Sequence, residues 1–158
     1  MPFRYRLQKF LEIRIKEKEA QLKVVQEAQN AVIVVERKIQ ENNKNINDTR
    51  INMRKSDPRM YDGFDKFLKH LYEIGEKLEQ EKIEAEKRLQ KELEILKEKE
   101  QKVNVLEKHK EHKKEEYLYE EKMAELKTLN EVGSQKHFMR QREQKEEQEN
   151  EEKYDEYQ

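Results

Sequence analysis

The stretch Asp57–Gly75, DPRMYDGFDKFLKHLYEIG, is unlike the rest of the chain. It holds four of the twelve aromatic residues, two of the three glycines and one of the two prolines, and runs of Glu, Lys, Gln and Arg flank it. Pro58 disfavours helical backbone at Asp57, whereas Asp57 can cap a new helix that has Pro58 at its first position. The stretch therefore predicts a break between two helices, with a turn at residues 56–63.

On the N-terminal side of this break, apolar residues recur every seven positions, which is typical of a coiled-coil seam. The pattern predicts a first helix over residues 3–55. One seam position is predicted to hold Leu11, Lys18, Val25, Val32, Ile39, Ile46 and Met53. The other is predicted to hold Leu7, Ile15, Leu22, Ala28 and Val35, weakening to Asn42 and Thr49.

The C-terminal side of the break carries a second and longer pattern. It predicts a helix over residues 64–132 that extends to about 140, with a stop or hinge at Gly133-Ser134. Residues 141–158 are acidic and lack a seam, so they are predicted to be frayed or disordered. One seam position carries Tyr61, Leu68, Gly75, Leu89, Leu96 and Val103, and the other carries Phe64, Leu71, Leu78 and Ala85.

A short break between two heptad segments favours an antiparallel pair of helices. The sequence thus predicts an all-α protein, a monomeric, long two-helix antiparallel coiled-coil hairpin over residues 1–140. At 1.5 Å per residue the first helix would span ~80 Å and the second ~110 Å. Phe3 would then lie opposite about Glu111, and the helix after His112 would form a C-terminal overhang. Such an isolated helix needs a partner protein or frays.

The composition excludes several classes of protein. Of the 158 residues 45% are charged and 33% are hydrophobic, too few apolar side chains for a rounded core. The formal net charge of −1 argues against a nucleic-acid-binding protein, and there is no cysteine for a disulfide. The longest aliphatic run, Ala31–Val35, is too short to span a membrane, and the N-terminus lacks the pattern of a signal peptide. We therefore expect a soluble cytoplasmic protein.

The sequence offers no catalytic chemistry. Its glycines, Gly63, Gly75 and Gly133, lie too far apart for a phosphate-binding loop. Two helices also enclose no pocket for paired carboxylates or a nucleophile. His109 and His112 have a spacing that can chelate a metal, but lysines surround them and a third ligand is missing. We expect no enzymatic activity, no cofactor and no metal site.

The central stretch has more apolar residues than a two-helix seam requires. Met60, Phe67 and Ile74 lie seven apart on one flank of the predicted seam, and Tyr72 lies on the other. One facing helix covers only a narrow stripe, so these residues indicate a docking face for a second protein. The alternative is that the aromatic rings cap the end of a thin core. The pattern leaves both interpretations open.

The two ends of the pattern also combine aromatic and basic residues. From their residues, the first sixteen positions could bind an anionic membrane surface or could be an ordinary coiled-coil end with solvated charges. A second cluster lies near the end of the overhang. The residues concerned are Phe3, Arg4, Arg6, Leu7, Lys9, Phe10, Leu11, Arg14 and Lys16 at one end, and Phe138, Met139, Arg140 and Arg142 at the other.

Three segments, in this order and spacing, resemble the FliJ family of flagellar type III export proteins. They are FRYRLQKFLEIRIKEKEAQ at the start, YDGFDKFLKHLYEI in the middle and LNEVGSQKHFMRQREQ near the end, and the resemblance covers Met1–Arg142. The acidic tail after Arg142 departs from the family pattern. The resemblance implies a stalk that inserts into the hexameric flagellar export ATPase and stimulates it. It also implies a link to the membrane export-gate protein, handling of export chaperones, and a peripheral location at the cytoplasmic face of the inner membrane.

The resemblance also implies which residues bind each partner. The export-gate residues are Phe64, Phe67, Leu71, Ile74 and Leu78; the ATPase-binding residues are Arg4, Arg6, Leu7, Phe10, Leu11, Arg14, Phe138 and Arg140. Two alternatives stay open: a coiled-coil scaffold or tether, and the equivalent stalk of an injectisome or rotary ATPase. A scaffold that pairs parallel with itself would not tolerate the break at Asp57-Pro58.

Overall fold

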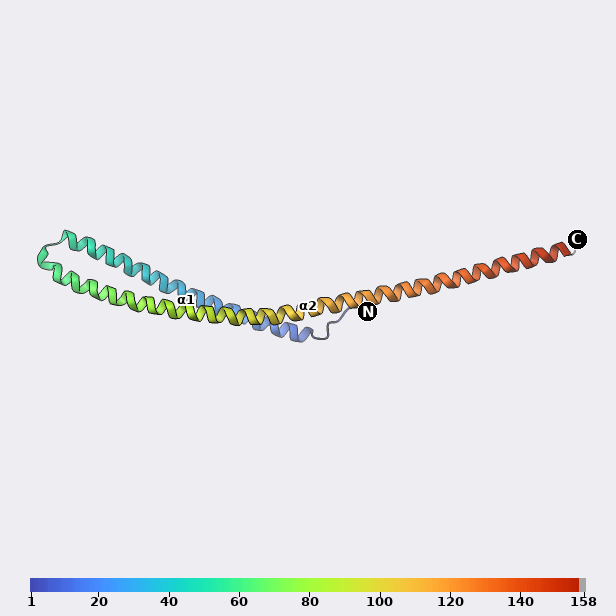
Figure 1. Ribbon diagram of the computed structural model, residues 1–158, viewed down its shortest axis with the longest axis horizontal. Helices are drawn as coiled ribbons and strands as arrows, with labels where there is room; N and C mark the ends of the chain where they lie inside the picture. The colour runs from blue at the N-terminus through green and yellow to red at the C-terminus, as the bar shows by residue number, and fades with distance from the viewer. Residues whose placement is uncertain (157–158) are drawn as a thin grey trace. The chain divides into compact units, whose positions relative to one another are not determined.

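The computed structural model describes residues 1–156, and every regular element in that range is a helix (Figure 1). Helix α1 spans Gln8–Lys55, the 3₁₀ turn η1 spans Pro58–Met60, and helix α2 spans Tyr61–Glu156. The first part of α2 packs along α1. The predicted all-α class, with two long helices packed together, is confirmed.

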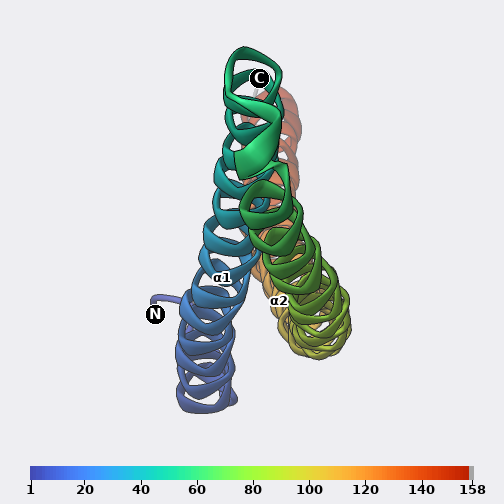
Figure 2. The ribbon, with the colours of Figure 1, turned by 90° about the vertical axis from the view of Figure 1, so that its left-hand side faces the viewer.

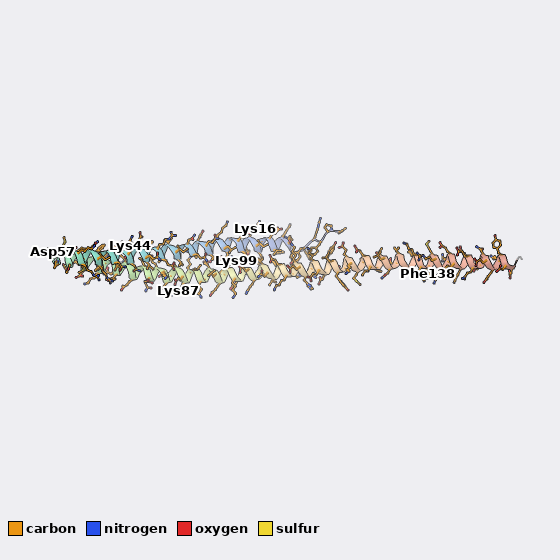
Figure 3. All side chains as sticks on the ribbon, turned by 90° about the horizontal axis from the view of Figure 1, so that it is seen from above. Lys16, Lys44, Asp57, Lys87, Lys99 and Phe138 are labelled. Atoms are coloured by element: carbon orange, nitrogen blue, oxygen red, sulfur yellow. The ribbon has the colours of Figure 1, made fainter. Side chains whose placement is uncertain are left out.

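The local sequence Ser56-Asp57-Pro58 determines the connection between α1 and α2, and Figure 3 labels Asp57 at this end of the paired helices. Ser56 has an extended backbone, with φ −94° and ψ 163°, and its N–H donates to the Met53 carbonyl at 3.2 Å. The Asp57 carboxylate accepts a hydrogen bond from the Arg59 N–H at 3.2 Å, and Pro58 follows it at the first helical position. Asp57 therefore caps a new helical segment, as predicted. The capped segment is a single 3₁₀ turn, and α2 begins at Tyr61 rather than at residue 64.

Helix α1 begins at Gln8, five residues after the predicted start at Phe3. Leu7 precedes the helix without a side-chain cap, and the first turn contains no acidic residue. A helix start at Phe3 would in addition place Arg4 and Arg6 in or next to the first turn, where the positive end of the helix dipole disfavours cations. Residues 1–5 accordingly have no regular secondary structure.

Helix α2 is continuous from Tyr61 to Glu156, through Gly133-Ser134, where a stop or hinge was predicted, and through the acidic residues 141–156. The predicted tail continues over residues 157 and 158, which lie outside the described range. A single glycine costs a helix only about 1 kcal/mol, and no proline follows it. The tail is rich in Glu, Gln and Lys, which are good helix formers.

The chain divides into two compact units, which differ from the predicted single hairpin domain over residues 1–140. One unit comprises Leu7–Glu107, and the other comprises Met1–Arg6 together with the chain from Lys108 onward. The boundary falls inside α2, where helix-to-helix packing against α1 gives way to contacts with the N-terminal residues. Each unit is described by itself below.

The core of the Leu7–Glu107 unit is one stripe on each helix, with buried residues spaced by threes and fours. Gln21 lies in this stripe in place of Leu22, which is 38% exposed. Gln21 lies seven residues before Ala28, so the seam keeps its heptad register here. The Leu22 side chain, one residue further along, is rotated about 100° around the helix axis and points away from the seam. The buried residues are Leu11, Gln21, Val25, Ala28, Val32, Val35, Asn42, Ile46 and Thr49 on α1, and Leu68, Leu71, Leu78, Leu96 and Val103 on α2.

Polar contacts join the two helices of this unit along its length. The Gln21 side-chain amide donates to the Glu92 carboxylate at 2.6 Å and to the Glu92 main-chain carbonyl at 3.0 Å. Asn42 donates to the Leu71 carbonyl at 3.0 Å. As the residue number increases along α1, the residue number of the partner on α2 decreases. Figure 2 views the two helices from the end at which they are connected. These contacts place Gln21 and Asn42 in the seam with their polar groups satisfied.

Candidate docking surfaces

Three apolar residues lie beside the seam: Met60 at the end of η1, and Phe67 and Ile74 near the start of α2. We call these three residues the aromatic flank, after Phe67. The side chains of Met60 and Phe67 are 63% and 49% exposed. Ile74 is half-buried. Because the seam residue Leu68 directly follows Phe67 and is buried, Phe67 contributes little to the core. The aromatic flank presents apolar surface that packing against α1 does not cover.

The structure separates the five residues assigned to the export gate into two groups. Leu71 and Leu78 are buried against α1, with 5% and 8% of their surface exposed, so they cannot touch a partner while the helices stay packed. Phe64 is half-buried, as is Ile74. Phe67 is the exposed member of the set. The assignment of Leu71 and Leu78 as contact residues is therefore inconsistent with their burial.

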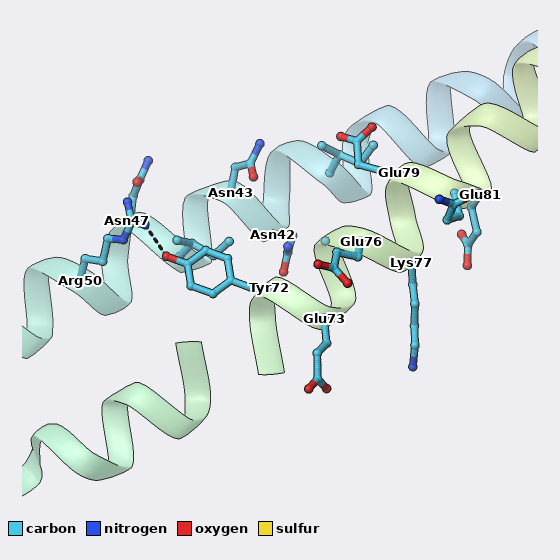
Figure 4. Close-up of a pocket in the computed structure, with 14 residues that line it drawn as sticks. Asn42, Asn43, Asn47, Arg50, Tyr72, Glu73, Glu76, Lys77, Glu79 and Glu81 are labelled. Atoms are coloured by element: carbon cyan, nitrogen blue, oxygen red, sulfur yellow. Dashed lines mark hydrogen bonds between the residues drawn. The ribbon is translucent and has the colours of Figure 1, made fainter. Parts of the chain in front are cut away.

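Tyr72, on the opposite flank, is engaged by α1. The Arg50 guanidinium donates to the Tyr72 hydroxyl, and its carbon lies 5.7 Å from the centre of the ring (Figure 4). Although Tyr72 is 42% exposed, this cation–π contact joins its ring to α1. Tyr72 is thus part of the contact between helices, and the free apolar surface lies on the aromatic flank.

A groove lies between the helices next to Tyr72 (Figure 4). Asn42 lies in it, and a Cβ placed on Gly75 would come within 3.1 Å of the Asn42 amide nitrogen. Gly75 therefore leaves room for the buried amide to reach the Leu71 carbonyl. Both acidic side chains, among them Glu76 and Glu79, and the apolar side chains of Ile39 and Ile46 line the groove.

The residues assigned to ATPase binding at the N-terminus have different environments. Within the Leu7–Glu107 unit, Phe10 is 61% exposed, whereas Leu11 is buried in the seam. Arg14 is half-buried and donates to the Glu17 carboxylate at 3.1 Å, and Leu7 is half-buried. Phe10 is therefore the apolar residue of this group that offers a free surface, and Leu11 is a core residue.

In the second unit, residues 1–6 pack on α2. The ring of Phe3 lies 5.6 Å from that of Tyr117, and the ring of Tyr5 lies 5.6 Å from that of His109. Phe3 was expected opposite Glu111, six residues earlier on α2. Because residues 1–5 are not helical, they advance further per residue than the helix assumed in that estimate.

The two predicted ATPase-binding clusters are not brought together in this unit. Arg4 and Arg6 are exposed on the N-terminal segment, which contacts α2 at His109 and Tyr117. Phe138 is 66% exposed and lies about 30 Å further along the helix from Tyr117 at 1.5 Å per residue. Arg140 is exposed beside it. A partner that touches both clusters must be at least this long.

Three pKa values are shifted in the second unit. The hydrogen bond between Lys113 and Glu116, at 2.7 Å, raises the pKa of the lysine and lowers that of the carboxyl. Burial raises the pKa of Tyr117. The Tyr117 hydroxyl donates to the Met1 carbonyl, which is a further contact between the N-terminal segment and α2.

The two histidines with chelating spacing are engaged by protein groups. His109 Nδ1 lies 2.8 Å from the Tyr5 hydroxyl, and His112 lies 3.3 Å from the Glu116 carboxylate. Within residues 1–156, no group of three or more potential metal-ligating side chains occurs. No helix in the described range is both long enough and apolar enough to cross a bilayer.

Comparisons with known protein families, with curated proteins and with solved structures gave no match to this chain.

Proposed function

We propose that this protein is an antiparallel coiled-coil stalk of the FliJ type, which stimulates a hexameric export ATPase and links it to a membrane export gate. In this proposal the protein handles export chaperones, has no catalytic activity of its own and acts at the cytoplasmic face of the inner membrane. Any ATP hydrolysis belongs to the ring. The exposed Phe67 beside a buried seam is the observation that carries the proposal.

Two features support a stalk over a scaffold. The contacts Gln21–Glu92 and Asn42–Leu71 join the helices within one chain. The exposed aromatic residues Phe10 and Phe67 lie near the two ends of the paired region, whereas the exposed residues along its length, such as Ile33 and Ile83, are aliphatic. The proposal depends on the order of the three resembling segments and on this geometry.

The gate interaction is tested at Phe67. A docking aromatic residue typically contributes ~1–3 kcal/mol to binding, which is about 5- to 150-fold in affinity. We expect Phe67→Ala to weaken binding to the purified cytoplasmic domain of the export gate at least fivefold, as measured by calorimetry. The melting temperature should change little, because truncation of a half-exposed side chain typically costs under ~1 kcal/mol.

Ile83→Ala is the matched control for this test. Ile83 is 43% exposed on the same helix but lies outside the aromatic flank. It should keep full affinity for the gate. If Phe67→Ala binds as tightly as the control, the aromatic flank is not the docking face. If Phe67→Ala instead lowers the melting temperature strongly, the ring caps the core.

The ATPase interaction is tested at Phe10. Deleting the first fourteen residues would also remove the buried Leu11, so a point substitution separates binding from folding. We expect Phe10→Ala to reduce stimulation of the export ATPase at least fivefold, measured as phosphate release at a fixed ring concentration. Ile33→Ala, 44% exposed further along α1, is the control and should stimulate normally.

The same variant distinguishes the membrane interpretation of the N-terminus. If Phe10→Ala stimulates the ATPase fully but loses binding to anionic phospholipid vesicles, the N-terminal cluster binds membrane and its assignment to the ring is wrong.

A further inference from the structure

The part of α2 in the second unit carries a broad apolar surface that faces solvent. Six side chains on this surface, between 44% and 66% exposed, are Leu118, Tyr119, Met123, Leu126, Leu129 and Phe138. A shallow hollow on the helix is lined by Met123, Leu126 and Phe138 among others. Monomeric proteins rarely leave so continuous an apolar surface uncovered, and an isolated helix gains most of its stability from packing.

The charges along this helix change sign in four successive blocks. Residues 108–114 are basic, with four lysines against one glutamate, and residues 115–125 are acidic, with five glutamates against one lysine. Residues 127–142 are basic again, with two lysines and two arginines against one glutamate. Residues 143–152 carry six glutamates against one lysine. From the N-terminal end the order of the blocks is basic, acidic, basic, acidic. From the C-terminal end it is acidic, basic, acidic, basic, so the two reading directions have opposite charge at every block.

We propose that this segment of α2 binds the same segment of a second copy of the chain, antiparallel, about a two-fold axis between Thr128 and Leu129. In that register each acidic block lies against a basic block of the second copy. Lys114 lies opposite Glu143, and Glu121 lies opposite Lys136. A parallel pair in register would place every block against one of like charge, which is destabilising.

Apolar residues fit the same register. Leu118 lies opposite Met139 of the second copy, and because the two residues are 21 positions (three heptads) apart, they lie on the same face of the helix. Leu129 lies next to the axis, and its side chain is 66% exposed in the single chain. One axis therefore accounts for the charge blocks and for these apolar residues together.

This interface leaves the Leu7–Glu107 unit unchanged and gives the acidic tail a role as the partner of residues 108–114. The proposed protein is a dimer and not the monomer that the sequence predicts. The two chains contact each other only through their second units. The inference depends on exposure and charge order, and it stands whether or not the protein is an export stalk.

The test is sedimentation equilibrium of the full chain at low salt, over roughly 1–200 µM. We expect a concentration-dependent monomer–dimer equilibrium that weakens as salt is added, because ion pairs at exposed positions are screened. Leu129→Lys should raise the dissociation constant at least tenfold, since it places two charges beside the axis. Val105→Lys, at a site 67% exposed outside the segment, should leave it unchanged.

The charge pair tests the antiparallel register. Lys114→Glu should weaken the dimer about three- to tenfold, because the interface contains two copies of the pair and each ion pair contributes up to about 1 kcal/mol. Adding Glu143→Lys in the same chain should restore the dissociation constant to within about twofold of the original.

A chain that stays monomeric throughout, or a Leu129→Lys variant that dimerises like the original, would overturn the proposal. So would a double variant without recovery.

Discussion

Replacing Leu68 and Leu71 with alanine is expected to lower the free energy of unfolding by about 2–5 kcal/mol and to impair every activity together. Both side chains are buried and form one cluster with Ile46, against which Met53 packs. Truncating a fully buried leucine typically costs ~2–5 kcal/mol, and a two-helix seam is thin enough to place each residue at the low end. Thermal unfolding followed by circular dichroism measures the loss.

Met60→Ala with Phe67→Ala is the control for the seam substitution. These residues are exposed on the aromatic flank, so the melting temperature should stay within a few degrees of the original. If the flank pair proves the more destabilising of the two, Met60 and Phe67 belong to the core and the seam has been assigned to the wrong face of α2.

The second large effect is expected from a charge placed in the seam. Val103 is 2% exposed, the lowest value among the large core residues, and Val103→Asp would bury a carboxylate without a partner. We expect the unfolding free energy to fall by about 3 kcal/mol or more at neutral pH. Burial would raise the pKa of this carboxyl above its usual ~3.9, so the loss should diminish as the pH falls below the raised value and should be smallest below about pH 4.

Val105→Asp provides a close comparison, because Val105 lies two residues away on the same helix and is 67% exposed. Both variants carry the same low helix propensity of aspartate, so the difference in unfolding free energy between them measures burial alone. Equal stability of the two variants would mean that Val103 does not lie between the helices.

The register of the seam could be predicted from the sequence where apolar residues occupy consecutive heptad positions. Val25, Val32 and Ile46 were assigned correctly because the seven-residue spacing is unbroken there. The second seam position of α1 was predicted wrongly near Leu22, since an apolar residue was preferred to a polar one. Gln21 is buried because its amide finds the Glu92 carboxylate and carbonyl, a partner that only the paired helices reveal.

Features that depend on weak local preferences were harder to predict. The start of α1 lacks any capping signal, so its position at Gln8 follows from contacts and not from a motif. The helix continues past Gly133 because one glycine is too small a penalty to end a helix of good helix formers. Among the proposed gate residues, a family pattern cannot separate the buried Leu71 from the exposed Phe67, whereas packing against α1 does.

The two buried amides have a mechanical consequence. If α1 slid along α2 by one heptad, Gln21 would leave Glu92 and Asn42 would leave Leu71 at the same time. An unsatisfied buried polar group costs about 1–3 kcal/mol, so the two losses together oppose sliding strongly. A force applied along one helix is therefore transmitted to the other. The two helices resist sliding past each other even though each single contact across the seam is weak.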